Sequence, residues 1–98
     1  MAIYVTLLDF TDQGVTAIQD SPHRADLFNE IAERHGARVV AQYWTLGIHA
    51  GVLIIEAPDE TTAASLLLRL DASGNVRTHT LRAFEWAEVQ DLIAPPAD

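Results

Sequence analysis

The chain has 98 residues, of which 49% are hydrophobic and 20% charged, so it can bury a core and has the length of one domain. Fourteen acidic residues against six basic ones give a formal charge of -8. This charge argues against duplex DNA or RNA as a partner, because phosphate backbones are bound by clustered Lys and Arg. The lack of cysteine excludes disulfides and thiol chemistry. Without a signal peptide or a membrane-length apolar run, we expect a cytoplasmic protein with no membrane partner.

Apolar periodicity predicts alternating strands and helices. The predicted strands are 3–10, 38–46, 48–57 and 75–84, and the predicted helices are 22–35, 59–70 and 85–94. Ser21 is predicted to cap the first helix, Gly36 to end it, and Asp59 to cap the second. Residues 15–20 are ambiguous and could form one helical turn. We therefore expect one domain over residues 1–94 and a flexible tail over residues 95–98.

The element order β-α-β-β-α-β predicts an α+β, ferredoxin-like fold with a short C-terminal helix. In this arrangement the two long helices cover only one face of the sheet. The third strand is nevertheless apolar at every position from Val52 to Ile55, which indicates that both of its faces are covered. A second copy of the sheet is the simplest cover, so we expect a homodimer packed sheet to sheet.

Five short stretches in order along the chain resemble the motifs of one protein family. They are Phe10-Thr11-Asp12-Gln13-Gly14, Asp20-Ser21-Pro22 with Arg24, Tyr43-Trp44-Thr45-Leu46-Gly47, Gly74-Asn75-Val76-Arg77-Thr78 and Thr80-Leu81-Arg82-Ala83-Phe84. Several motifs in sequence are more specific than a single glycine-rich fragment. On these residues the chain resembles the GYD domain family, small bacterial and archaeal proteins of largely unassigned function.

The resemblance implies a dimeric α+β barrel, and one departure from the family motif is informative. The family is named for a Gly, Tyr and Asp cluster, of which Gly47 is kept, while His49 and Ala50 stand where Tyr and Asp are expected. Related barrels include haem proteins and cofactor-independent monooxygenases. The resemblance therefore admits haem, with His49 as its axial ligand. Its apolar slot would be built from Trp44, Leu46, Leu53 and Ile55.

His49 is the main candidate for a catalytic residue. An imidazole at a strand bend can exchange a proton near neutral pH, with Asp12 or Glu56 as the expected hydrogen-bond partner. His79 also falls on a predicted strand and is a candidate ligand contact. The structural alternative for both is a partly buried histidine bonded to backbone or to a carboxylate. None of the four histidines has the spacing of a metal site, so we expect no metal.

The other candidate ligand contacts are Asp12, Tyr43, Trp44 and Arg77. Alternation along the strand sends Tyr43 and Trp44 to opposite faces, as pocket walls or as plain core. Asp12 is an acceptor at a pocket mouth, or part of a polar turn. Arg77 shares a face with His79 and could bind a substrate carboxylate. It could equally pair with a surface glutamate.

Two classes of function remain open. The first is binding of a small molecule in a barrel pocket, with or without modest enzymatic activity and with an unknown cofactor. The second is a non-enzymatic interaction module that acts through its dimeric sheet. A closed pocket that contains His49 and Arg77 would favour the first class, whereas a filled interior would favour the second.

Overall fold

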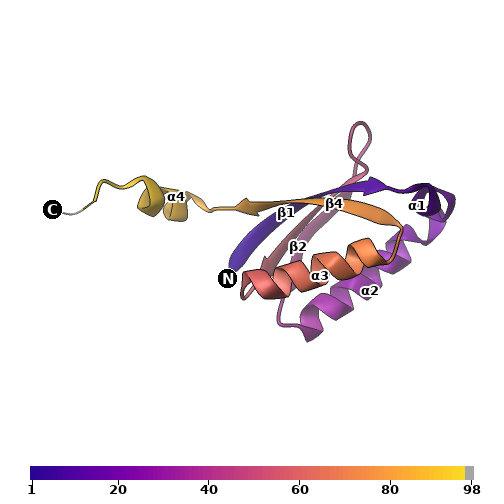
Figure 1. Ribbon diagram of the computed structural model, residues 1–98, viewed down its shortest axis with the longest axis horizontal. Coiled ribbons are helices and arrows are strands. Elements are labelled where there is room, and N and C mark those ends of the chain that lie inside the picture. Colours follow the sequence, from indigo (N-terminus) through magenta and orange to yellow (C-terminus); the bar gives the residue numbers. More distant parts are fainter. Residues whose placement is uncertain (97–98) are drawn as a thin grey trace.

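The computed structural model describes residues 1–96 and shows an α+β fold built on a four-stranded antiparallel sheet (Figure 1). Its elements are β1 (Ala2–Phe10), α1 (Asp12–Thr16), the 3-10 helix η1 (Ile18–Asp20), α2 (Ser21–Arg34), β2 (Arg38–Trp44), β3 (Gly51–Ala57), α3 (Glu60–Ala72), β4 (Val76–Ala83) and α4 (Trp86–Ile93). The strand order β2-β3-β1-β4 confirms the ferredoxin-like prediction. The predicted tail ends in residues 97–98, which lie outside the described residues.

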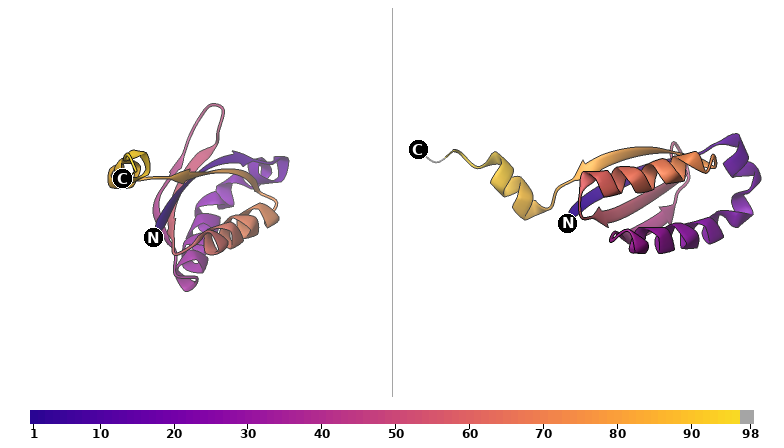
Figure 2. Two further views of the ribbon diagram at one scale, coloured as in Figure 1. Left: turned by 60° about the vertical axis from the view of Figure 1, so that its left-hand side comes forward. Right: turned by 60° about the horizontal axis from the view of Figure 1, so that its bottom comes forward.

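Helices α2 and α3 lie side by side on one face of the sheet and form the core with it (Figure 2). Gly36, at φ 76°, follows the end of α2, and the Asp59 side chain accepts a hydrogen bond from Thr62 N to cap α3, both as predicted. The buried core residues are Tyr4, Phe28, Ala32, Ala37, Leu53, Ile55, Ala57, Ala63 and Leu66. Thr6 is also fully buried, and its hydroxyl lies 2.9 Å from the Thr80 hydroxyl.

The other face of the sheet, here called the open face, has no helix over it in the described part of the chain (Figure 2). Val5 pairs with Ile54 on one side and with Leu81 on the other, so apolar side chains run across this face. The β3 strand is fully buried at Leu53 and only partly buried at Ile54. The prediction that both faces of this strand are covered is therefore not met within one chain.

The connection between β2 and β3 differs from the prediction. The strands stop at Trp44 and resume at Gly51, so His49 lies in a hairpin loop and not on a strand. Thr45 Oγ1 donates to His49 O at 2.7 Å, and Gly47 has φ 112°, a value that favours glycine. These local interactions replace the strand pairing that alternation predicted.

A second difference lies within β2, where a β-bulge interrupts the alternation of side chains. Val39 pairs with Ile55 on the helix side, whereas Ala41 pairs with Ile54 on the open face. Strict alternation along the strand would place Val39 and Ala41 on the same face. The extra residue at the bulge shifts the pattern by one position.

The residues after β1 form more helix than predicted. The Thr11 hydroxyl accepts from Gly14 N at 3.1 Å, which caps α1, and donates to Gly74 O at 2.6 Å. Gly14 packs directly against the backbone of Asn75. These contacts fasten α1 to the turn that precedes β4.

Helix α4 stands away from the body on an extended arm (Figure 1), and the molecule measures 59 × 31 × 19 Å. None of its residues is buried. The Arg82 guanidinium lies 4.4 Å from the centre of the Phe84 ring and 3.4 Å from Glu88 Oε2, which holds the arm to the end of β4. In residues 1–96 no helix has the length and apolar character to cross a membrane.

Candidate functional site

Two predicted site histidines meet on a carboxylate at the open face. His49 Nδ1 lies 2.9 Å from Asp9 Oδ1, and His79 Nε2 lies 3.0 Å from Asp9 Oδ2. The two imidazole centres are 6.0 Å apart. Because an ionised carboxylate can only accept, both rings donate to Asp9. The partner of His49 is thus Asp9, and not the predicted Asp12 or Glu56.

Strand register and the hairpin loop bring these three residues together. Within the sheet, His79 pairs with Leu7 and Arg77 pairs with Asp9, so all four residues belong to neighbouring strands. Ala50 N donates to Leu8 O at 2.7 Å, which holds the loop against β1 and places His49 beside Asp9.

The electrostatics of the cluster favour an ionised Asp9. The hydrogen bond from His49 holds the pKa of the Asp9 carboxyl below its ordinary value, and it is helped by His79 against the opposing effect of desolvation. Asp9 and His49 are each about one-third exposed, at 33% and 34%, so the cluster is open to solvent. An imidazole held in this way can exchange protons with a bound molecule.

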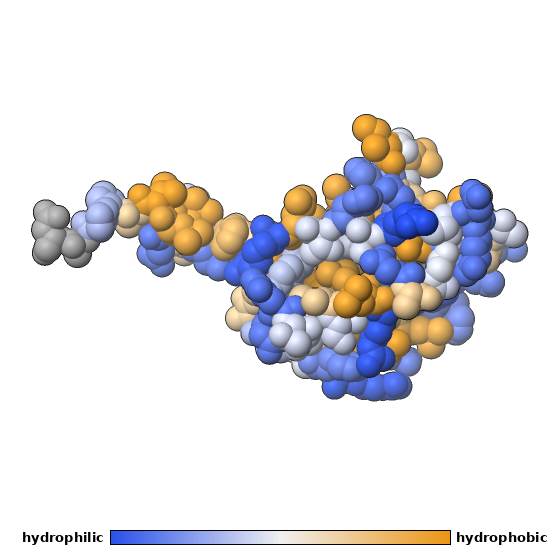
Figure 3. Space-filling model, viewed as in Figure 1, coloured by the Kyte–Doolittle hydropathy of each residue, from blue (hydrophilic) through white to orange (hydrophobic). Residues whose placement is uncertain are grey.

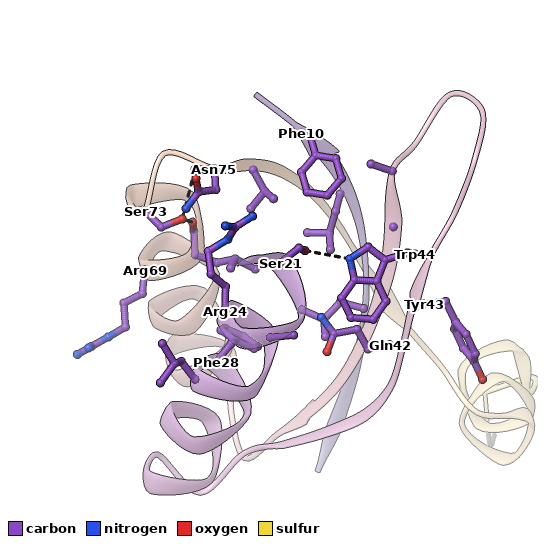
Figure 4. A pocket seen from close by; sticks show the side chains of 18 of the residues that line it. Phe10, Ser21, Arg24, Phe28, Gln42, Tyr43, Trp44, Arg69, Ser73 and Asn75 are labelled. Carbon is purple, nitrogen blue, oxygen red and sulfur yellow. Dashed lines mark hydrogen bonds between the residues drawn. The ribbon is translucent and has the colours of Figure 1, made fainter. Parts of the chain in front are cut away.

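A separate cavity of about 310 Å³ lies between α2 and the sheet (Figure 4). Its apolar walls come from Leu8, Phe10, Ala25, Leu27, Phe28, Ile31, Leu53, Leu70 and Val76. Leu8 faces the helices while its neighbour Asp9 faces the other way. The sheet therefore separates the cavity from the histidine cluster, and the molecule has two candidate sites.

Polar groups stand at the wall of this cavity. Trp44 Nε1 donates to Ser21 Oγ at 2.9 Å, so Ser21 links α2 to β2 and does not cap the helix as predicted. Arg24 Nη1 donates to Ala17 O at 2.9 Å, and its buried Nη2 has no hydrogen-bond partner within residues 1–96. Arg69 also lines the cavity, and its guanidinium points outward in Figure 4. The lining includes two arginines and no acidic residue.

The predicted ligand contacts are distributed over both faces of the sheet. Trp44 lines the cavity on the helix side, and the Tyr43 side chain points away from it in Figure 4 and is 62% exposed. Arg77 and His79 lie on the open face and border a second hollow of about 400 Å³. Asp12 is exposed in the first turn of α1 and lines neither space.

Haem does not fit the residues around His49. Leu53 and Ile55, two of the expected slot residues, are fully buried on the helix side of the sheet. Leu46 is fully exposed at the hairpin, and Trp44 lines the cavity on the far face. His49 therefore lacks the apolar slot that a haem needs. In residues 1–96 no three His, Asp or Glu side chains are arranged to hold a metal ion.

The sequence interpretation missed Asp9 and the role of Arg24. Asp9 was a visible signal, because it is a charged residue in the otherwise largely apolar run 3–10 and a carboxylate on a face that is expected to be covered needs a partner. Arg24 was noted only as part of a motif. Its place in the cavity wall depends on how α2 packs, which local sequence does not specify.

Comparison with known proteins agrees with this fold and these motifs. The sequence description of the GYD domain matches residues 4–93, nearly the whole chain. The chain belongs to the GYD domain family. A relative from Thermus thermophilus is 40% identical over 95 residues, which cover 96% of this chain and 97% of the relative. That relative is named glutamine synthetase and cystathionine beta-lyase binding protein. No solved structure is significantly similar to the chain.

Proposed function

We propose that this GYD domain protein is a homodimeric, non-enzymatic protein that binds metabolic enzymes. The relative from Thermus thermophilus, similar along its whole length, is named for binding glutamine synthetase and cystathionine beta-lyase. We extend that activity to this chain. The structural observation that carries the proposal is the set of apolar side chains that one chain leaves exposed, among them Leu81 on the open face, Leu68 on α3 and Trp86 on α4, since exposed apolar patches in proteins commonly mark interaction sites.

The open face supports the homodimer. Val5, Ile54 and Leu81 form a row across three strands, and Leu81 is 58% exposed. Two such faces packed together would bury these side chains, and each Å² of apolar surface removed from water would stabilise the dimer by roughly 25 cal/mol. The same packing would cover the outer side of β3, as the apolar run from Val52 to Ile55 predicts.

The outer surface of α3 is then the surface that we assign to the enzyme partner. With the open faces packed together, the dimer presents its helices to other proteins. Leu68 is 67% exposed on α3, with the small exposed residues Thr61, Ala64 and Ala72 on the same side of the helix. Figure 3 shows an apolar area over α3 in the middle of the body. We take this apolar area, which includes Leu68, as the surface that an enzyme partner covers.

The test uses calorimetry to measure binding of the purified chain to purified glutamine synthetase and to purified cystathionine beta-lyase from the same organism. We expect micromolar or tighter binding to at least one enzyme, and at least tenfold weaker binding by Leu68→Asp. The matched control is Val15→Asp, at a 55% exposed position of α1, which should bind like the unmodified chain. If neither enzyme binds, the proposal is wrong. If the two variants bind alike, the assigned surface on α3 is wrong.

The histidine cluster favours a second candidate function, binding of a small molecule at the open face. The observation behind it is that Asp9 orients two imidazoles side by side, with Nε2 of His49 and Nδ1 of His79 making no hydrogen bond in the described residues. Native mass spectrometry of the protein as purified tests it. A retained small molecule that His49→Ala loses without a change in circular dichroism would support this function, and its absence from both proteins would count against it.

A further inference from the structure

The C-terminal arm carries an apolar surface with no partner in its own chain. On a helical projection of α4, Trp86, Val89, Leu92 and Ile93 form one continuous stripe. Their exposed fractions run from 39% at Val89 to 77% at Trp86. Figure 3 shows an apolar area on the arm, away from the body. A helix of eight residues is not stable alone in water, so it needs another surface to pack on.

The arm is also acidic. Residues 83–98 contain Glu85, Glu88, Asp91 and Asp98 and no basic residue. Glu85 and Glu88 form a capping box at the start of α4, so both carboxylates lie beside the first turn, next to Trp86. The Glu88 carboxylate already contacts Arg82 of its own chain, so the negative charge that the helix presents beside its apolar anchor comes from Glu85 and Asp91.

The cavity between α2 and the sheet has the complementary character. It combines apolar walls with Arg24, whose Nη2 is buried without a hydrogen-bond partner in residues 1–96, and it has no acidic lining residue. The Arg69 guanidinium points outward from the same wall. At about 310 Å³ it is at the lower end of the size of ligand pockets, which suits one large side chain and its neighbours. A helix whose apolar anchors enter such a groove is a common mode of recognition.

We infer that α4 of one chain docks in the helix–sheet cavity of a second copy, with Trp86 as its anchor. This inference rests on the homodimer of the proposed function and names a contact that would lock it. The arm cannot reach the cavity of its own chain, because the two lie at opposite ends of the strands. Figure 1 shows the arm following the end of β4. The residues that line the cavity include Val76 at the start of β4 and Trp44 at the end of β2.

A twofold axis perpendicular to the strands makes the exchange reciprocal. Two sheets related by such an axis run in opposite directions, so the end of β4 in one chain lies beside the start of β4 in the other. Each arm then leaves its own sheet beside the end of the partner's strands at which the cavity lies, and it passes around that end to reach the helix side of the partner's sheet. The hairpin residues Leu46 and Ile48, which are 102% and 92% exposed, project at this same end and could close over the arm.

The absence of cysteine from the chain allows a direct test by disulfide cross-linking between full-length chains. One chain carries Val89→Cys on α4, and the other carries Leu27→Cys, at a 45% exposed position of the cavity wall. Each variant holds one cysteine, so any disulfide joins two chains. The control pairs Val89→Cys with Val15→Cys, an exposed position outside the cavity. We expect the Val89–Leu27 pair to cross-link at least tenfold faster than the control.

A second measurement uses Trp86→Ser, which should weaken self-association at least tenfold in sedimentation experiments. Equal cross-linking of both pairs, or faster Val89–Val89 cross-linking, would show that α4 docks elsewhere. Octanoate, a small carboxylate with an apolar body, tests whether the cavity takes a small molecule instead of the arm. If it binds there without slowing the cross-link, the arm does not occupy the cavity. A chain that dimerises and binds enzymes without this cross-link would refute the arm contact alone, whereas a monomeric chain would refute the proposed dimer.

Discussion

Asp9 and His49 are 40 residues apart in the chain, yet Asp9 Oδ1 and His49 Nδ1 lie 2.9 Å from each other. The contact exists because the hairpin loop after β2 folds back on β1, where Ala50 bonds to Leu8. It gives the open face a polar corner at the edge of an apolar surface. A buried or partly covered polar corner fixes how two such faces can pack, because its groups must keep their partners.

The first prediction concerns Asp9→Asn. The hydrogen bond from His49 lowers the pKa of Asp9 in the folded protein, so its stabilising effect is complete above the unfolded value of about 3.9 and is lost as pH falls through the lower folded value. We expect the variant to be less stable than the unmodified chain at pH 5 and the difference to shrink below about pH 4. Urea unfolding at several pH values measures this. The exposed Asp26→Asn is the control, and a difference that grows on acidification would contradict the prediction.

The second prediction concerns Gly14→Ala in α1. A Cβ at residue 14 would clash with the carbonyl oxygen of Asn75, which belongs to the backbone and cannot rotate away. We expect a loss of about 3 kcal/mol in the free energy of unfolding. Gly36→Ala is the comparison, since its Cβ would meet open space and only the φ of 76° disfavours alanine, at a cost of about 1 kcal/mol. Urea unfolding that ranks the two variants in the opposite order would show that α1 shifts to make room for the added Cβ.

The element order and several local contacts could be predicted from the sequence, because they depend on neighbouring residues. The cap at Asp59 and the pair between Glu30 and Arg34, at 3.8 Å, are of this kind. The faces of β2 could not be predicted, since one bulge residue near Val40 reverses the alternation. The sequence carries no separate mark for such an insertion.

The candidate site was only partly predictable for a similar reason. His49 and His79 were found as residue types, but their shared partner Asp9 depends on strand register across 40 and 70 residues of chain. The helix–sheet cavity depends on the distance between α2 and the sheet, which side-chain packing sets. Trp44 was predicted as a wall or as core, and only the fold shows that it lines this cavity.

The third prediction is that duplex DNA is not a ligand. The formal charge of -8 repels a polyanion, and three of the six basic residues are already paired with glutamates, namely Arg34, Arg38 and Arg82. We expect any affinity for random duplex DNA at physiological salt to be weaker than about 100 µM. Fluorescence anisotropy with a labelled duplex measures it. Micromolar binding that weakens as salt is added would contradict the expectation.

The last prediction concerns the proposed dimer and the substitution Ile54→Asp. Ile54 lies in the middle of the open face, paired with Val5 and Ala41, while the adjacent Leu53 points into the core. A carboxylate at this position remains hydrated in a single chain, so the chain should still fold. Between two packed faces it would be buried without a partner, which costs at least about 3 kcal/mol and therefore weakens dimerisation at least about 100-fold.

Analytical ultracentrifugation measures this effect over a range of concentrations, with circular dichroism to confirm that the variant folds. Val15→Asp adds the same charge at an exposed position of α1 and should leave the dimer unchanged, which separates the effect of position from that of net charge. A monomeric unmodified chain would rule out the dimer itself. A dimer that tolerates aspartate at residue 54 would instead place the interface away from the open face, and the apolar row through Val5 and Leu81 would then need a different partner.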